Sequence, residues 1–156
     1  MEINILIEEE FKGKITRTWL SEIARKVLVA EKTDDSVELG ILLTNQQKIH
    51  ELNRKYRNID KATDVLSFFM IPEKGLADAF VTPPDNIRHL GEVIISYPQA
   101  KIQAKERNHP IKQEITILII HGVLHLLGYD HEDLNDEKIM RARESAILSY
   151  FQEVLC

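Results

Sequence analysis

Three of the six histidines in this chain lie within eleven residues, HGVLHLLGYDH, at positions 121–131. His121 and His125 are four residues apart, so on a helix their side chains share one face, with Cβ atoms about 5–6 Å apart. Gly128 follows where a helix needs a residue that tolerates the left-handed conformation in order to end. The chain can then turn back and bring His131 toward the same point. Three protein ligands with one open position are typical of a catalytic zinc site, whereas structural sites are closed by four.

The apolar surroundings of these histidines favour a metal over a purely structural role. A single histidine on an apolar helix is usually a core residue with its own hydrogen-bond partner. The neighbours of His121 and His125 are Ile, Val and Leu, whose side chains cannot satisfy two imidazoles. One metal ion would satisfy both rings at once. All-imidazole ligation favours a single zinc ion over magnesium or calcium, although nickel, copper, iron and manganese also accept imidazole.

The spacing H-x3-H-x2-G-x2-H is also that of the metzincin proteases, which indicates a zincin-like metal site. In those enzymes a glutamate directly follows the first histidine and serves as general base. Gly122 occupies that position here. The sequence therefore predicts the metal site of such a protease without its proton acceptor.

Hydrophobic periodicity predicts the elements that position this motif. The stretch 71–91, rich in proline and glycine, is expected to be a long loop, and loops of that length are usually functional or partly disordered. Thr44 and Gln47 have the spacing of a capping box and predict a helix start at Thr44. Strands are expected at 2–7, 37–43, 65–69 and 92–96, and helices at 14–30, 44–56, 98–108, 111–127 and 133–155.

The order of these elements predicts an α/β (α+β) fold, a small mixed four-stranded sheet covered by about five helices. At 156 residues the chain is expected to form a single domain, 1–156, with a core large enough to fold without a metal. The stretch 111–127 is so apolar that we expect it to be a buried central helix that carries two of the histidines.

Composition narrows the possible environments and partners. The longest apolar run is too short to cross a bilayer, and the lone cysteine, Cys156, fits a reducing compartment, so a cytoplasmic protein is expected. The net charge of −5 argues against general coating of nucleic acid. Basic residues nevertheless gather at 48–61 and 101–112, although such runs are most often solvated helix faces.

The motif HGVLHLLGYDH resembles the signature of the YbeY family of bacterial rRNA-maturation endoribonucleases. Two further stretches, 52–68 and 90–96, are similar to that family's blocks LNxxYRxxDxxTDVLSF and LGDIxIS, in the same order. The resembling region runs from about 37 to 132. Two positions depart from the pattern: Phe69 stands where the family often has Pro, and Glu92 where it often has Asp.

This resemblance implies a zinc-dependent endoribonuclease that acts on single-stranded RNA, matures the 3′ end of small-subunit 16S rRNA and takes part in ribosome quality control. The implied partners are rRNA and the small ribosomal subunit, with no membrane; no oligomeric state is indicated. The implied metal ligands are His121, His125 and His131, and Arg57 matches the family's functional arginine. Residues that could contact substrate or support the ligands are Asp64, Ser67, Glu92 and Asp130.

Zinc held by three neutral imidazoles can lower the pKa of its bound water to about 7. The resulting hydroxide can attack phosphorus directly or deprotonate the ribose 2′-OH. Either route builds negative charge on phosphoryl oxygens, which the guanidinium of Arg57 would stabilise. Two other functions stay open: a metal-dependent hydrolase of another substrate, such as a peptide or amide, and a non-catalytic ribosome-assembly factor in which zinc only stabilises the fold.

Overall fold

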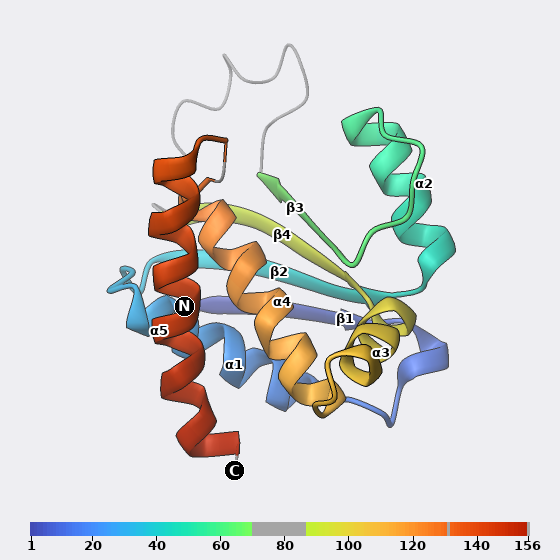
Figure 1. Ribbon diagram of the computed structural model, residues 1–156, viewed down its shortest axis with the longest axis horizontal. Helices are drawn as coiled ribbons and strands as arrows, with labels where there is room; N and C mark the ends of the chain where they lie inside the picture. Colours follow the sequence, from blue (N-terminus) through green and yellow to red (C-terminus); the bar gives the residue numbers. More distant parts are fainter. Residues whose placement is uncertain (70–86, 131, 156) are drawn as a thin grey trace.

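The computed structural model describes residues 1–69, 87–130 and 132–155, which contain one mixed sheet of four strands in the order β1-β2-β4-β3 (Figure 1). The central strand β2 runs parallel to β1 and β4, and β3 is antiparallel to β4. The predicted mixed four-stranded sheet is therefore confirmed. The strands are β1 (Glu2–Ile7), β2 (Val37–Thr44), β3 (Val65–Phe69) and β4 (Arg88–Ser96).

Strand β4 begins four residues earlier than the sequence predicts, so part of the expected loop is strand. Its register with β2 shifts between Glu38 and Leu39, and Gly91 adopts a φ of 131°. A bulge of this kind inserts one extra residue and interrupts the alternation by which a strand is identified. Residues 71–86 of the expected loop lie outside the described residues.

Five α-helices and a short 3-10 helix, η1 (Glu9–Phe11), accompany the sheet in the described residues. The predicted helix start at Thr44 is wrong, because α2 begins two residues later, at Gln46, and its cap is Asn45. Thr44 is the buried last residue of β2, and the Asn45 side chain caps the helix by accepting a hydrogen bond from the Lys48 backbone N–H at 2.8 Å. The α-helices are α1 (Arg17–Ala30), α2 (Gln46–Arg57), α3 (Tyr97–Glu106), α4 (Ile111–Leu126) and α5 (Leu134–Leu155).

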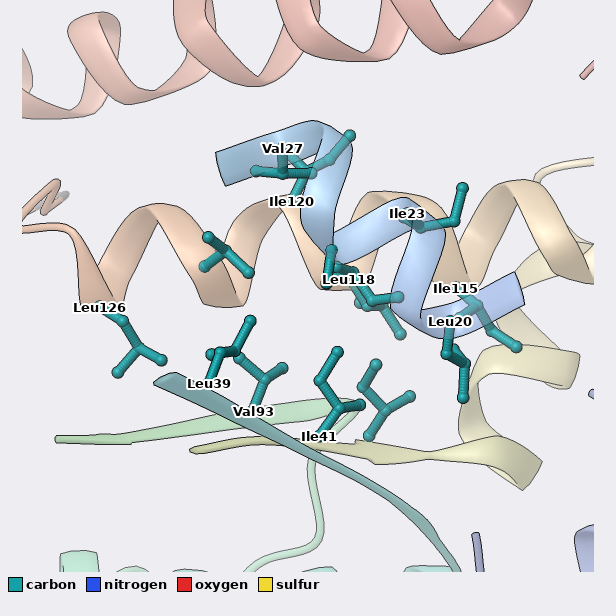
Figure 2. Packing of buried hydrophobic residues seen from close by; sticks show 14 of the residues in the cluster. Leu20, Ile23, Val27, Leu39, Ile41, Val93, Ile115, Leu118, Ile120 and Leu126 are labelled. Carbon is teal, nitrogen blue, oxygen red and sulfur yellow. The ribbon is translucent and has the colours of Figure 1, made fainter. Parts of the chain in front are cut away.

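Helices cover the two faces of the sheet unequally. Helix α4 crosses one face, with α1, α3 and α5 around it, whereas α2 stands apart from them beside β3 (Figure 1). The main core lies under α1 and α4, where apolar side chains of both helices meet those of β2 and β4 (Figure 2). A smaller cluster of Ile49, Leu66 and Ile94 holds α2 against the other face.

Ten of the sixteen residues of α4 are buried, which confirms the predicted buried central helix. Because α4 packs against β3, β4, α1, α3 and α5, the position of any side chain that it carries is fixed from several directions. None of the described helices combines the length and the hydropathy needed to cross a membrane.

Candidate functional site

A cavity of about 650 Å³ opens beside the C-terminal half of α4. It is bordered by α4, the start of β3, the last residue of α2 and the turn that follows α4. Two of the three expected metal ligands lie in its wall together with the arginine singled out from the sequence. The lining residues are Arg57, Thr63, Asp64, Val65, Ser67, His121, His125, Asp130 and Glu132.

His121 and His125 lie on one face of α4, as their spacing predicts. Their ring centroids are 4.7 Å apart, and the ring planes are inclined at 79°. The Nδ1 atom of His121 lies 2.9 Å from Oε1 of Glu144 on α5. The two imidazoles therefore line one cavity, and a carboxylate supports the first of them from the neighbouring helix.

The helix ends as the sequence predicts, through Gly128. This residue has a φ of 106°, and its N–H donates to the His125 carbonyl at 3.1 Å. The Tyr129 N–H donates to the Leu124 carbonyl at 3.0 Å. These two bonds form a Schellman motif, which turns the chain back toward the cavity and places Asp130 in its wall.

Tyr129 fastens this turn to two other helices. Its hydroxyl donates to Oε2 of Glu31 at 2.8 Å, and Arg143 of α5 binds Oε1 of the same carboxylate through Nε at 2.8 Å and Nη2 at 2.7 Å. Burial and the hydrogen bond to Glu31 raise the pKa of Tyr129 above its ordinary value, so the phenol stays protonated and donates at neutral pH. The turn after α4 is thus held by α1 and α5.

Gly122 marks the closest approach of α4 to the sheet. A Cβ atom at this position would lie 2.6 Å from Cγ1 of Val93 and 3.1 Å from Oγ of Ser67. The Ser67 hydroxyl in turn donates to the Gly122 carbonyl at 3.1 Å. The side chain that metzincins carry at this position has no room here, and Ser67 joins β3 to α4.

Arg57 is the last residue of α2, and the turn after it is fixed by local hydrogen bonds. Asn58 adopts the left-handed conformation with a φ of 60°, which ends the helix. The Asn53 side-chain amide donates to the Lys61 carbonyl at 2.9 Å, and Nε2 of His50 lies 2.7 Å from Oδ1 of Asp60. Arg57 therefore projects from an anchored helix end into the cavity wall, and its side chain is exposed.

Asp64 is a structural anchor at the start of β3. Its Oδ1 accepts hydrogen bonds from the Val65 N–H at 2.8 Å and the Thr63 hydroxyl at 3.2 Å. Its Oδ2 accepts from the Gln103 amide at 3.3 Å, and the same amide donates to the buried Glu114 at 2.8 Å. One glutamine thus joins the cavity wall to the first turn of α4.

Glu114 is completely buried in the strongly apolar helix α4. Arg107 reaches both of its oxygens, at 2.9 and 3.2 Å, and Nε2 of His109 lies 2.7 Å from Oε1. A buried carboxylate is tolerated only when it is paired and hydrogen-bonded, and the first turn of a helix favours negative charge. The N-terminal end of α4 is consequently pinned to α3.

The described residues include two of the three ligands that the sequence predicts for a metal. His121 and His125 could provide two imidazole nitrogen donors, and the carboxylates of Asp64, Asp130 and Glu132 line the same cavity and favour a cation there. His131 lies outside the described residues, and within those described no group of three His, Cys, Asp or Glu side chains is arranged to hold a metal. The donor chemistry fits zinc, which remains a prediction.

The structure brings most of the expected site residues together. Arg57, Asp64, Ser67 and Asp130 line the cavity with the two histidines, but Glu92 does not. Glu92 is exposed on the opposite face of β4, where its Cγ would lie 3.1 Å from a Cβ at Gly40. Sequence reasoning missed two carboxylates, Glu132 and Glu144. Glu132 directly follows the motif, whereas nothing in the sequence distinguishes Glu144 from the other acidic residues of its helix.

Comparison with known proteins gives a consistent result. The sequence model of the family described as Endoribonuclease YbeY matches residues 3–152. The chain belongs to this family. Relatives named Endoribonuclease YbeY include one from Dehalococcoides mccartyi, 47% identical over 99% of this chain and 92% of its own, and one from Bacillus cereus, 42% identical over 93% and 89%.

The fold of the YbeY family is also seen in a solved structure. The solution structure of a Thermotoga maritima protein covers 97% of this chain and 90% of its own length, with a TM-score of 0.61 and 28% identity. The cavity described above lies within the part of the chain that the YbeY family model covers.

Proposed function

We propose that this chain is a zinc-dependent endoribonuclease that cleaves single-stranded RNA in the cytoplasm. We further propose that it matures the 3′ end of 16S rRNA on the small ribosomal subunit and serves in ribosome quality control. The observation that carries the proposal is the presence of Arg57, His121 and His125 in the wall of one cavity. The names of relatives that span nearly the whole chain support the same activity.

In this proposal His121 and His125 bind the metal through neutral imidazoles, together with His131. Zinc bound there would supply a Lewis acid and a water molecule with a pKa lowered to about 7. The planar guanidinium of Arg57 orients the scissile phosphate and stabilises the charge that builds on two of its oxygens. The carboxylates of Asp130 and Glu132 line the same cavity, and in this proposal one of them accepts a proton from the nucleophile.

The geometry at Gly122 disfavours the alternative of a peptidase. A glutamate at this position would be the general base of a metzincin, and the contacts with Val93 and Ser67 leave no space even for its Cβ. RNA cleavage does not require a general base at this position, because a ribose 2′-OH or water can be activated without a carboxylate on that turn of α4.

Cleavage of single-stranded RNA by an Arg57 variant tests the proposal. Arg57→Ala should lose RNA cleavage by about 10²–10³-fold, as expected when one donor to a developing anion is removed. Its zinc content and unfolding midpoint should stay unchanged because the side chain is exposed at a helix end. The matched control is Arg25→Ala, which removes an exposed arginine of α1 that does not line the cavity.

The result with each substrate distinguishes between the candidate functions. RNA cleavage that is abolished by a chelator and restored by zinc supports the proposal, and ribosomes that carry unprocessed 16S rRNA test the cellular substrate. Normal cleavage by Arg57→Ala would remove this arginine from the mechanism. Chelator-sensitive hydrolysis of casein without cleavage of RNA would favour the peptide alternative.

A further inference from the structure

Helix α5 places a carboxylate directly behind one of the proposed metal ligands. Oε1 of Glu144 lies 2.9 Å from Nδ1 of His121, and the two side chains are only 27% and 33% exposed. The residues are 23 positions apart in the sequence, so this contact exists only because α5 packs along α4. A short contact between two partly buried side chains of different helices is a defined feature of the fold.

The backbone of α5 is fixed on both sides of this glutamate. Met140, one turn before it, and Ile147, one turn after it, are 1% and 2% exposed and belong to the main core. Arg143, the preceding residue, binds the Glu31 carboxylate that also holds Tyr129. The Glu144 side chain therefore starts from an anchored position and needs little ordering to reach His121.

The chemistry of this contact selects one form of the imidazole. A carboxylate can only accept a hydrogen bond, so the nitrogen that faces it must carry the proton. Neutral His121 then has its hydrogen on Nδ1, and its lone pair is on Nε2. Metal-binding histidines commonly show this arrangement, in which the carboxylate fixes the ring and increases its basicity.

We propose that Glu144 is a positioning residue, which holds His121 in the tautomer that is protonated on Nδ1 and has the metal-binding lone pair on Nε2. This inference rests on the metal site of the proposed function. Glu144 lies on α5, outside the signature motif, and in this proposal it directly affects the affinity for the metal. Glu144 does not line the cavity on the substrate side; with His121 it lines a smaller one of about 290 Å³ between α4 and α5.

Zinc affinity, measured by competition with a chromophoric chelator, tests the role of Glu144. Glu144→Ala should weaken zinc binding by 10–100-fold, the usual effect of losing a carboxylate behind a metal-binding histidine. Glu144→Gln should lose less, because its amide oxygen can still accept from Nδ1–H without adding charge. The matched control is Glu137→Ala: Glu137 borders the same small cavity, but its carboxylate pairs with Arg141 at 2.6 Å.

A second readout separates positioning from a general structural effect. In the metal-free protein, nitrogen-15 spectra of the imidazoles should show His121 protonated at Nδ1 in the wild type. Glu144→Ala should give a mixture of both tautomers, with little change in the unfolding midpoint. A purely structural contact would shift the midpoint and leave zinc affinity unchanged.

The outcomes are distinct for the inference and for the proposed function. Wild-type zinc affinity in Glu144→Ala, or equal losses in Glu144→Ala and Glu137→Ala, would overturn the role of Glu144. If the wild type binds zinc but does not cleave RNA, the proposed function fails and the zinc comparison still decides the inference. A wild type that binds no zinc would overturn both.

Discussion

At the scale of single residues, close packing of α4 against the sheet explains why a glycine, and not a catalytic side chain, stands at position 122. Its position suggested a missing general base, and the structure gives the physical cause, because Val93 and Ser67 occupy the space that a side chain would need. Glycine in a helix interior costs about 1 kcal/mol relative to alanine. The fold accepts this cost because it lets α4 lie close to β3 and β4.

Gly122→Ala should lower the free energy of unfolding by about 1–3 kcal/mol, as overpacking of a well-packed core does. Val93 cannot relieve the clash easily, since its β-branched side chain is stiff and completely buried. Urea denaturation measures the change.

The control for this substitution is a double-mutant cycle with Val93→Ala. The smaller side chain makes room at Gly122, so the double variant should be more stable than the sum of the two single changes, by about 0.5–3 kcal/mol. An unchanged or increased stability of Gly122→Ala would show that the contact is relieved by a small shift of α4.

Sequence reasoning was effective for residues whose role depends on local spacing. The i, i+4 relation of His121 and His125 and the helix end at Gly128 follow from helix geometry alone, and both are confirmed. The contact between Glu144 and His121 could not be derived in this way. It depends on how α5 packs across α4, which no local pattern encodes.

At the scale of elements, the C-terminal turn of α2 joins the cavity to a basic surface. Arg54, Lys55 and Arg57 occupy the last turn, and exposed Lys61 follows in the anchored loop. Exposed lysines near a cavity that receives RNA would neutralise phosphates and release counterions on binding. We expect the RNA strand to run along this helix end before it enters the cavity.

The double variant Lys55→Ala/Lys61→Ala should weaken binding of a short single-stranded RNA and reduce the slope of log affinity against log salt by about 2, one for each lysine. Fluorescence anisotropy between low and moderate salt measures both effects.

The comparison variant is Lys101→Ala/Lys105→Ala on α3, which removes the same charge from the other basic run. Its affinity and salt slope should remain close to those of the wild type. Equal losses in the two double variants would place the RNA path across α3 as well.

Most element types were predictable from the sequence, whereas some boundaries were not. Alternation and helical periodicity identified four strands and five helices because each element buries one face. The start of β4 was missed because a bulge interrupts its pattern, and the cap of α2 was misplaced because Asn45 competes with Thr44 one residue earlier. Sequence patterns predict which face of an element is buried more reliably than they predict the residue at which a strand or helix begins.

At the scale of the whole molecule, we expect the fold to form without the proposed metal. The main core joins β2 and β4 to α1, α4 and α5 without any contribution from His121 or His125. The site is attached to this core by hydrogen bonds from α1, α3 and α5. A metal bound there should add stability to a protein that is already folded.

Chelator-treated protein should keep its helical circular dichroism and unfold cooperatively. Zinc at about 100 times its dissociation constant should then raise the free energy of unfolding by about 2.7 kcal/mol, because it binds only the folded state. Thermal or urea unfolding with and without zinc measures this increment, and His125→Ala should remove it. A metal-free chain that is unfolded would instead favour the alternative in which zinc only stabilises the fold.

The position of α5 in the chain has a consequence during synthesis. Arg143, which helps hold the turn after α4, and Glu144, which faces His121, are adjacent residues that follow all the strands and the other four α-helices of the described residues. Translation proceeds from the N-terminus, so the residues of the described sheet and of the cavity wall are made before either of these two. Within the described residues, the supports that Arg143 and Glu144 give to the turn after α4 and to His121 are therefore the last of the site's contacts to be made.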